Sequence, residues 1–217
     1  MEVKGDKNPL SGAAYGIFEI ILNRELTKNG KYLFERVESG EDFRDDFDVI
    51  FSDFEDEYPQ LSQVLADEPG GKDRIYEMLL EGEGVIPSRT TRMYWIVQDT
   101  PDFSPDDLDD EKGGKWLIFT EKADIDEVWR KIRDATAEGR LGISARVSTA
   151  KENPDSRDER AVVYVNTADW EDEEDVMRIR EVLRELGIEQ RIGYKRNIET
   201  YLGEYSEGGK KVTYYSA

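Results

Sequence analysis

Between Gly113 and Tyr215, strand-like runs alternate with two amphipathic helical patterns. The helical patterns run from Asp124 to Gly139, and from Asp169 or Asp172 to Gly187, with apolar residues at steps of three and four. Strand-forming residues occupy 115–120, 142–149, 161–166, 191–195 and 211–215. This order predicts an α+β fold, in which two helices pack on one face of a curved, mostly antiparallel sheet.

Residues 1–91 have the pattern of an acidic helical region. Apolar residues at helical spacing predict helices over 11–37, with Ser11 as its cap and Ile17 on its apolar face, over 41–58, and over 72–82, with Leu80 on its apolar face. A strand-like run at 93–97 then opens the second part. The sequence therefore predicts a helical N-terminal extension, 1–91, followed by an α+β domain, 92–217.

The 217 residues include no Cys and no His. Disulfides, thiolate zinc sites, cysteine nucleophiles and a Ser-His-Asp triad are therefore excluded. The acidic run 106–111 lacks the spacing and the central glycine of a calcium loop. We expect no metal and no cofactor.

The net charge is −20, which argues against general DNA binding because cationic side chains drive that interaction. The surplus is uneven: residues 1–91 carry −11, whereas 113–149 carry +1 and 177–217 carry +2. An anionic ligand is best tolerated in these two near-neutral stretches. The acidity fits a halophilic source, and an ordinary acidic mesophile protein is the alternative.

The chain shows no apolar run long enough for a membrane span and no signal-peptide pattern at its start. We expect a soluble, cytoplasmic protein with no membrane partner.

Six polar side chains come from three predicted strands or their ends. If the strands are neighbours, alternation brings Lys115, Arg146 and Ser148 onto one face, where they would bind a phosphate or carboxylate. The alternative is that each cation is solvated and paired with a nearby acid. The candidate ligand-binding residues are Lys115, Arg146, Ser148, Lys151, Lys195 and Arg196.

Several strings resemble known families. The run 113–118, the helix with Asp126-Glu127-Val128-Trp129, and Ile192-Gly193-Tyr194-Lys195 resemble the second half of the cap-binding translation initiation factor 4E. The strings 139–150, 168–176 and 194–201 are similar to the Bles family of uncharacterised proteins, which adopts the same fold. The resemblance covers 113–217 and extends to 92 at most.

The resemblance implies two activities. In the initiation factor, two tryptophans sandwich a methylated guanine and basic residues hold the phosphates. This sequence has Phe103 and Leu108 near the tryptophan positions, Lys115 at a basic position, and Ser148 in place of an arginine. Some Bles members carry a phosphothreonine lyase label, an activity that needs a lysine base, a cation cradle and, in the lyase family, a histidine acid.

Three hypotheses follow. The first is a non-enzymatic protein that binds a phosphorylated small molecule, nucleotide or RNA end at Lys115 and Arg146. The second is a lyase or other phosphate-handling enzyme, with Lys115 or Lys195 as base and Tyr194 or Tyr201 as acid. The third is an interaction module that docks a protein partner through residues 1–91.

Overall fold

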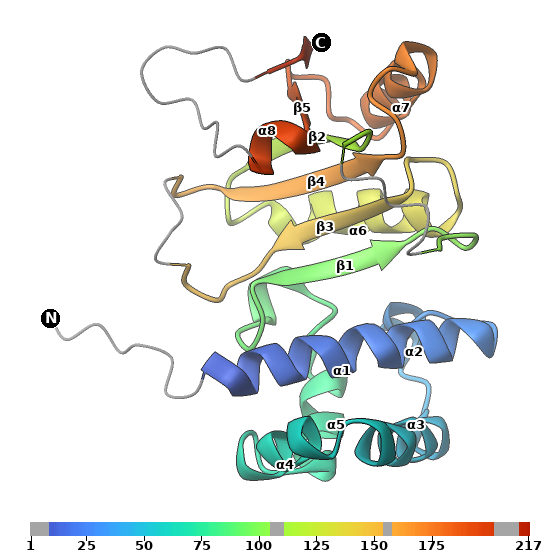
Figure 1. The fold of residues 1–217 in the computed structure, drawn as a ribbon, viewed down its shortest axis with the longest axis vertical. Coiled ribbons are helices and arrows are strands. Elements are labelled where there is room, and N and C mark those ends of the chain that lie inside the picture. Colours follow the sequence, from blue (N-terminus) through green and yellow to red (C-terminus); the bar gives the residue numbers. More distant parts are fainter. Residues whose placement is uncertain (1–8, 105–110, 154–157, 202–212) are drawn as a thin grey trace, which may run out of the picture. The chain divides into compact units, whose positions relative to one another are not determined.

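The computed structural model describes residues 9–104, 111–153, 158–201 and 213–217 (Figure 1). They form two compact units. The helical unit comprises the described residues of Met1–Ile96 and Thr149–Asp155, and the sheet unit those of Val97–Ser148 and Ser156–Ala217. Residues 149–153 thus belong to the helical unit, although they follow a strand of the sheet unit. The domain boundary at residue 91 stays a prediction.

An aromatic core holds the helical unit together. Its elements are α1 (Pro9–Lys28), α2 (Leu33–Ser39), α3 (Arg44–Glu57), α4 (Pro59–Asp67), α5 (Lys72–Leu80) and the 3-10 turn η1 (Pro87–Arg89). Phe18 of α1 meets Phe47, Phe51 and Phe54 of α3, with ring centroids 5.1–5.8 Å apart. These edge contacts add to the large apolar area that each ring buries. The helix predicted over 41–58 is confirmed.

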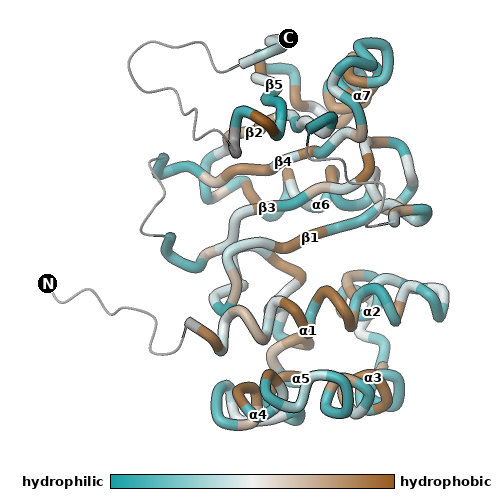
Figure 2. Tube along the Cα trace, viewed as in Figure 1, coloured by the Kyte–Doolittle hydropathy of each residue, from teal (hydrophilic) through white to brown (hydrophobic). Residues whose placement is uncertain are grey.

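The remaining helices differ from the prediction. The segment 11–37 forms two helices, α1 and α2, and Ser11 lies inside α1, where its hydroxyl donates to the Glu68 carbonyl at 2.7 Å. Ile17 of α1 and Leu80 of α5 are exposed, although the spacing placed both on apolar faces. Helix α4 was not predicted. Figure 2 shows hydrophobic residues along much of α1. Because the apolar residues of α1 lie on all sides of the helix, their spacing alone could not indicate which face of α1 packs against α3.

The sheet contains β1 (Trp95–Asp99), β2 (Gly114–Thr120), β3 (Ser144–Ser148), β4 (Ala161–Thr167), β5 (Gly193–Arg196) and β6 (Tyr215–Ser216). Their spatial order is β1-β3-β4-β2-β5-β6. The pairs β3–β4, β4–β2, β2–β5 and β5–β6 are antiparallel. Residues 211–212 of the last predicted strand lie outside the described residues.

Two helices, α6 (Ile125–Ala137) and α7 (Glu173–Glu185), cover one face of the sheet, and α6 lies behind β3 and β4 in Figure 1. Trp116 of β2 and Trp129 of α6 are fully buried, as their apolar patterns indicate. The Trp116 indole N–H donates to the Val176 carbonyl of α7 at 3.1 Å. The predicted α+β fold, with helices on one face of an antiparallel sheet, is confirmed.

A buried arginine ties α7 to the edge of the sheet. Arg180 is inaccessible to solvent and donates to the main-chain oxygens of Ile188, Gln190 and Ala217 at 2.7–3.1 Å. Burial lowers its pKa from the ordinary value, but an arginine stays charged. These three charge-assisted bonds fix the chain on both sides of β5.

None of the described helices is both long and apolar enough to cross a membrane.

Candidate functional site

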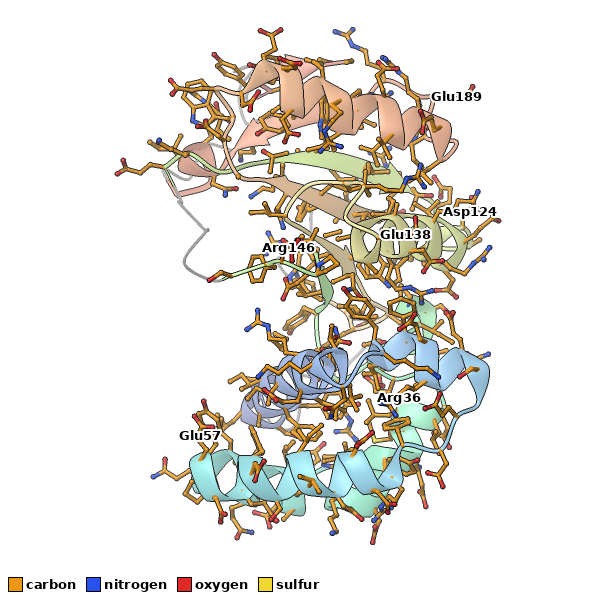
Figure 3. All side chains as sticks on the ribbon, turned by 90° about the vertical axis from the view of Figure 1, so that its right-hand side faces the viewer. Arg36, Glu57, Asp124, Glu138, Arg146 and Glu189 are labelled. Atoms are coloured by element: carbon orange, nitrogen blue, oxygen red, sulfur yellow. The ribbon has the colours of Figure 1, made fainter. Side chains whose placement is uncertain are left out.

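The face of the sheet opposite α6 and α7, here called the second face, carries the polar residues of the central strands. Strand alternation places Lys115 of β2, Arg146 of β3 and Tyr164 of β4 on this face, because Trp116, Val147 and Val165 are buried on the other. Figure 3 shows Arg146 on the opposite side of the sheet from Glu138, which follows α6. The two predicted cations therefore share one face.

Tyr164 lies between these two cations. Arg146 is directly opposite Tyr164 in the β3–β4 register, whereas Lys115 is opposite Asn166, two residues further along β4. The Arg146 guanidinium carbon lies 4.9 Å from the centre of the Tyr164 ring, and the Lys115 Nζ lies 5.6 Å from it. Both distances are typical of cation–π contacts.

Asn197 holds Lys115 from a different element. The Lys115 Nζ donates to the Asn197 Oδ1 at 3.1 Å, and only 7% of Lys115 is exposed. Asn197 begins α8 (Asn197–Tyr201), and its N–H donates to the Gly113 carbonyl at 2.9 Å. We call Lys115, Arg146, Tyr164 and Asn197 the cation–aromatic cluster.

Burial makes the cluster favourable for anions. Desolvation lowers the pKa of Arg146 from its ordinary value, and the charge interaction with the nearby Tyr164 acts in the opposite direction without cancelling it. Arginine nevertheless remains protonated at any physiological pH. A charge that has lost part of its hydration gains more from an anion than a solvated charge does.

Two further predicted residues lie on the same face. Lys195 of β5 is directly opposite Lys115, and directly opposite residues of an antiparallel pair share a face. Ser148 has the same parity as Arg146 along β3, and its Oγ accepts the Val162 N–H at 2.9 Å. Ser148 therefore extends the β3–β4 pairing.

Arg196 does not join the cluster. It follows Lys195 on the same strand and so lies on the side of Tyr194, which packs in the core. Its guanidinium carbon is 4.9 Å from the Trp170 ring centre, and it pairs with Glu199 at 2.9 Å. These contacts indicate a structural role for Arg196. The Arg196 guanidinium also covers part of the Trp170 ring, which is half-buried.

Lys151 belongs to the helical unit. Its Nζ donates to the Arg92 carbonyl at 2.9 Å and lies 4.5 Å from the centre of the Tyr94 ring. These contacts connect residues 149–153 to the chain that precedes β1.

Tyr194 cannot act as the acid for a substrate on the second face. Its side chain is fully buried on the helix-covered face, with its hydroxyl 2.6 Å from the Thr167 Oγ1 and its ring against Trp116. Burial raises the pKa of Tyr194 to about 12. Lys115 and Lys195, the predicted bases, project from the opposite face. The Tyr201 side chain, Leu108 and the acidic residues 106–110 lie outside the described residues.

Tyr164 and Asn197 were not among the predicted site residues. Tyr164 could have been found, because it has the same parity as Val162 and Asn166 in a strand whose other residues, Ala161, Val163, Val165 and Thr167, are buried in the core. Asn197 gives no such signal, since it reaches Lys115 across 82 positions of sequence. In the described part of the chain, no group of three or more acidic side chains is placed to hold a metal ion.

The sheet unit thus defines an α+β domain with helices on one face of an antiparallel sheet and a cation–aromatic cluster on the other. Residues 111–203 match the family model described as basophilic leukemia-expressed protein Bles03. This segment makes up less than half of the chain, and its match agrees with the similarity of the sequence strings to that family.

Solved structures of initiation factor 4E also align with the chain. Schistosome eIF4E complexed with m7GpppA and 4E-BP matches with 20% identity and a TM-score of 0.39 over 54% of this chain. The complex of C. elegans eIF4E-3 with Mextli and cap analog matches with 20% identity and a TM-score of 0.40 over 54% of this chain. The alignments span 66% and 64% of those chains, just under two thirds of their length.

Proposed function

We propose that the second face of the sheet binds a nucleotide or a similar phosphorylated ligand, without catalysis. The observation that carries the proposal is the convergence of Lys115 and Arg146, from two different strands, on the Tyr164 ring between them. Two cations provide charge-assisted bonds to phosphate oxygens, and the aromatic ring provides a surface for a planar base. A nucleotide combines both chemical features.

The positions of the cations favour a ligand with few phosphates. Lys115 and Arg146 are both partly desolvated, and Asn197 fixes the Lys115 ammonium. A preorganised pair of this kind loses little side-chain entropy on binding. The chain as a whole carries −20, so we expect a local, specific interaction and no affinity for long duplexes.

The test is a calorimetric titration of the full chain with AMP, inorganic phosphate, a cap analogue and a phosphothreonine peptide. AMP is expected to bind at least tenfold more weakly to Lys115→Met and Arg146→Met, because each removes a charge-assisted bond. Lys131→Met is the matched control, since this exposed lysine lies on α6 and pairs only with Glu127 among its described contacts.

Each other outcome contradicts the proposal. If AMP does not bind, or if both variants bind AMP as tightly as the wild type, then the cluster is not a nucleotide site. If the phosphothreonine peptide instead loses the elements of phosphoric acid, as mass spectrometry would detect, then the protein is an enzyme of the lyase type.

A further inference from the structure

A second candidate binding surface, made of an arginine and an aromatic ring, lies on the same face of the sheet as the cluster. The Arg160 guanidinium carbon is 4.9 Å from the centre of the Phe119 ring on β2. Arg160 also donates to both carboxylate oxygens of Asp158, at 3.0 and 2.7 Å. Phe119 is 36% exposed and the Arg160 side chain is 47% exposed. We call Phe119, Arg160 and Asp158 the stacking platform.

The platform has a defined orientation. The two hydrogen bonds to Asp158 fix the plane of the guanidinium, and the Phe119 ring supports it from one side. The remaining surface of the guanidinium is available to solvent. Nucleic-acid bases stack on guanidinium planes as well as on aromatic rings.

The platform and the cluster are neighbours in the sheet. Leu117 of β2 is opposite Tyr164, and Phe119 is opposite Val162. Phe119 and Tyr164 are therefore diagonal neighbours on one face, and such positions are roughly 7–8 Å apart. Leu117 and Val162, both half-buried, form an apolar surface between them. Two bases splayed out of a helical stack could occupy the two positions.

We propose that the second face binds a single-stranded oligonucleotide, with one base stacked on the Phe119–Arg160 platform and its neighbouring nucleotide at the cation–aromatic cluster. This inference rests on the proposed function and extends it from a mononucleotide to a strand. Asp158 balances the Arg160 charge, so the platform contributes stacking and does not neutralise a phosphate.

The experiment compares the tetranucleotide rA4, labelled with fluorescein, and AMP as ligands of the full chain. rA4 is expected to bind more tightly than AMP to the wild-type protein. Arg160→Ala and Phe119→Leu are expected to weaken rA4 binding at least fivefold, while AMP affinity changes less than twofold. Phe119→Leu preserves an apolar side chain in the sheet, so a folding defect would not account for its effect.

Arg178→Ala is the matched control. Arg178 is an arginine of α7 that pairs with Asp175 at 2.8 Å, and its side chain is 49% exposed, close to the 47% of Arg160. It lies on the helix-covered side of the sheet, so its removal is expected to leave both affinities unchanged.

The salt dependence distinguishes stacking from phosphate contact. Each phosphate neutralised on a single strand contributes about −0.7 to the slope of log affinity against log salt. Arg160→Ala is expected to leave this slope unchanged for rA4. A slope that becomes less steep by about 0.7 overturns the stacking assignment.

Failure of the two proposals can be told apart. Suppose that AMP binds and that its affinity depends on Lys115 and Arg146. If rA4 then binds no more tightly than AMP, or if its affinity does not change in Arg160→Ala and Phe119→Leu, this inference alone is wrong. If neither AMP nor rA4 binds, both proposals are wrong.

Discussion

Among single residues, the two tyrosines Tyr164 and Tyr194 show how the two faces of the sheet differ: one carries the cations and the other packs against the helices. Tyr164 lies among cations on the second face, whereas Tyr194 is enclosed with Trp116 and Thr167 on the helix-covered face. Their positions follow from strand alternation in β4 and β5. Alternation also explains why Lys115 and Arg146 lie on one face, although β4 separates their strands. It explains equally why the adjacent residues Lys195 and Arg196 could not both face a ligand.

Because Tyr194 is buried, the free energy of unfolding is expected to decrease at alkaline pH. Its pKa is about 12 in the folded state, and an exposed tyrosine in the unfolded chain ionises near 10. The unfolded state therefore loses its proton first, so the contribution to stability is complete below pH 10 and is lost between pH 10 and 12. The loss is about 2 kcal/mol at pH 12.

The measurement is the free energy of unfolding of wild type and Tyr194→Phe, by urea denaturation from pH 9 to 12. Because phenylalanine does not ionise, the stability advantage of the wild type over the variant is expected to shrink by about 2 kcal/mol across this range. An advantage that stays constant with pH would show that Tyr194 ionises equally easily in both states.

At the scale of the strands and helices, close approach decides which glycines are essential. A Cβ atom at Gly114 would lie 2.0 Å from the Tyr194 hydroxyl oxygen and 2.4 Å from its Cζ. The ring of Tyr194 thus packs directly on the β2 backbone, and only glycine permits this contact. Gly16, inside α1, has no neighbour closer than 3.7 Å to the equivalent position.

Alanine at these two glycines is expected to have opposite effects. Gly114→Ala must displace a buried ring and should cost about 1–3 kcal/mol. Gly16→Ala should stabilise by about 0.5–1 kcal/mol, because alanine loses less backbone entropy in a helix and fits beside Met93. Chemical denaturation of both variants tests this. A neutral Gly114→Ala would mean that the Tyr194 ring can move without cost.

In the protein as a whole, charge is the dominant property. Twenty surplus negative charges repel one another, and the surplus is concentrated in residues 1–91 and 150–176. Many of the described arginines and lysines already pair with carboxylates at the surface, such as Arg44 with Asp48 and Lys131 with Glu127. Exposed pairs of this kind contribute little stability. Net repulsion therefore remains, and it is sensitive to salt.

The melting temperature is expected to rise as KCl is increased from 0.1 to 1 M, because the screening length falls from about 10 to 3 Å. For a chain of this size, each kcal/mol of repulsion removed corresponds to about 2–4 °C. Calorimetry in KCl gives the measurement, and sulfate is avoided because it also stabilises by exclusion from the surface. A flat or falling melting temperature would contradict the expectation. A fold that requires molar KCl would favour a halophilic source, which stays a prediction.

The sequence by itself determined the alternation of strands and helices from Gly113 onward, the aromatic face of α3, and the common face of Lys115 and Arg146. These features depend on spacings of two, three or four residues, which local geometry translates directly into faces. The tertiary structure alone decided the strand order that places β4 between β2 and β3, the Asn197 contact to Lys115, and the buried face of α1. Each of these joins residues distant in sequence, and their pairing depends on how whole elements pack together, which no local spacing records.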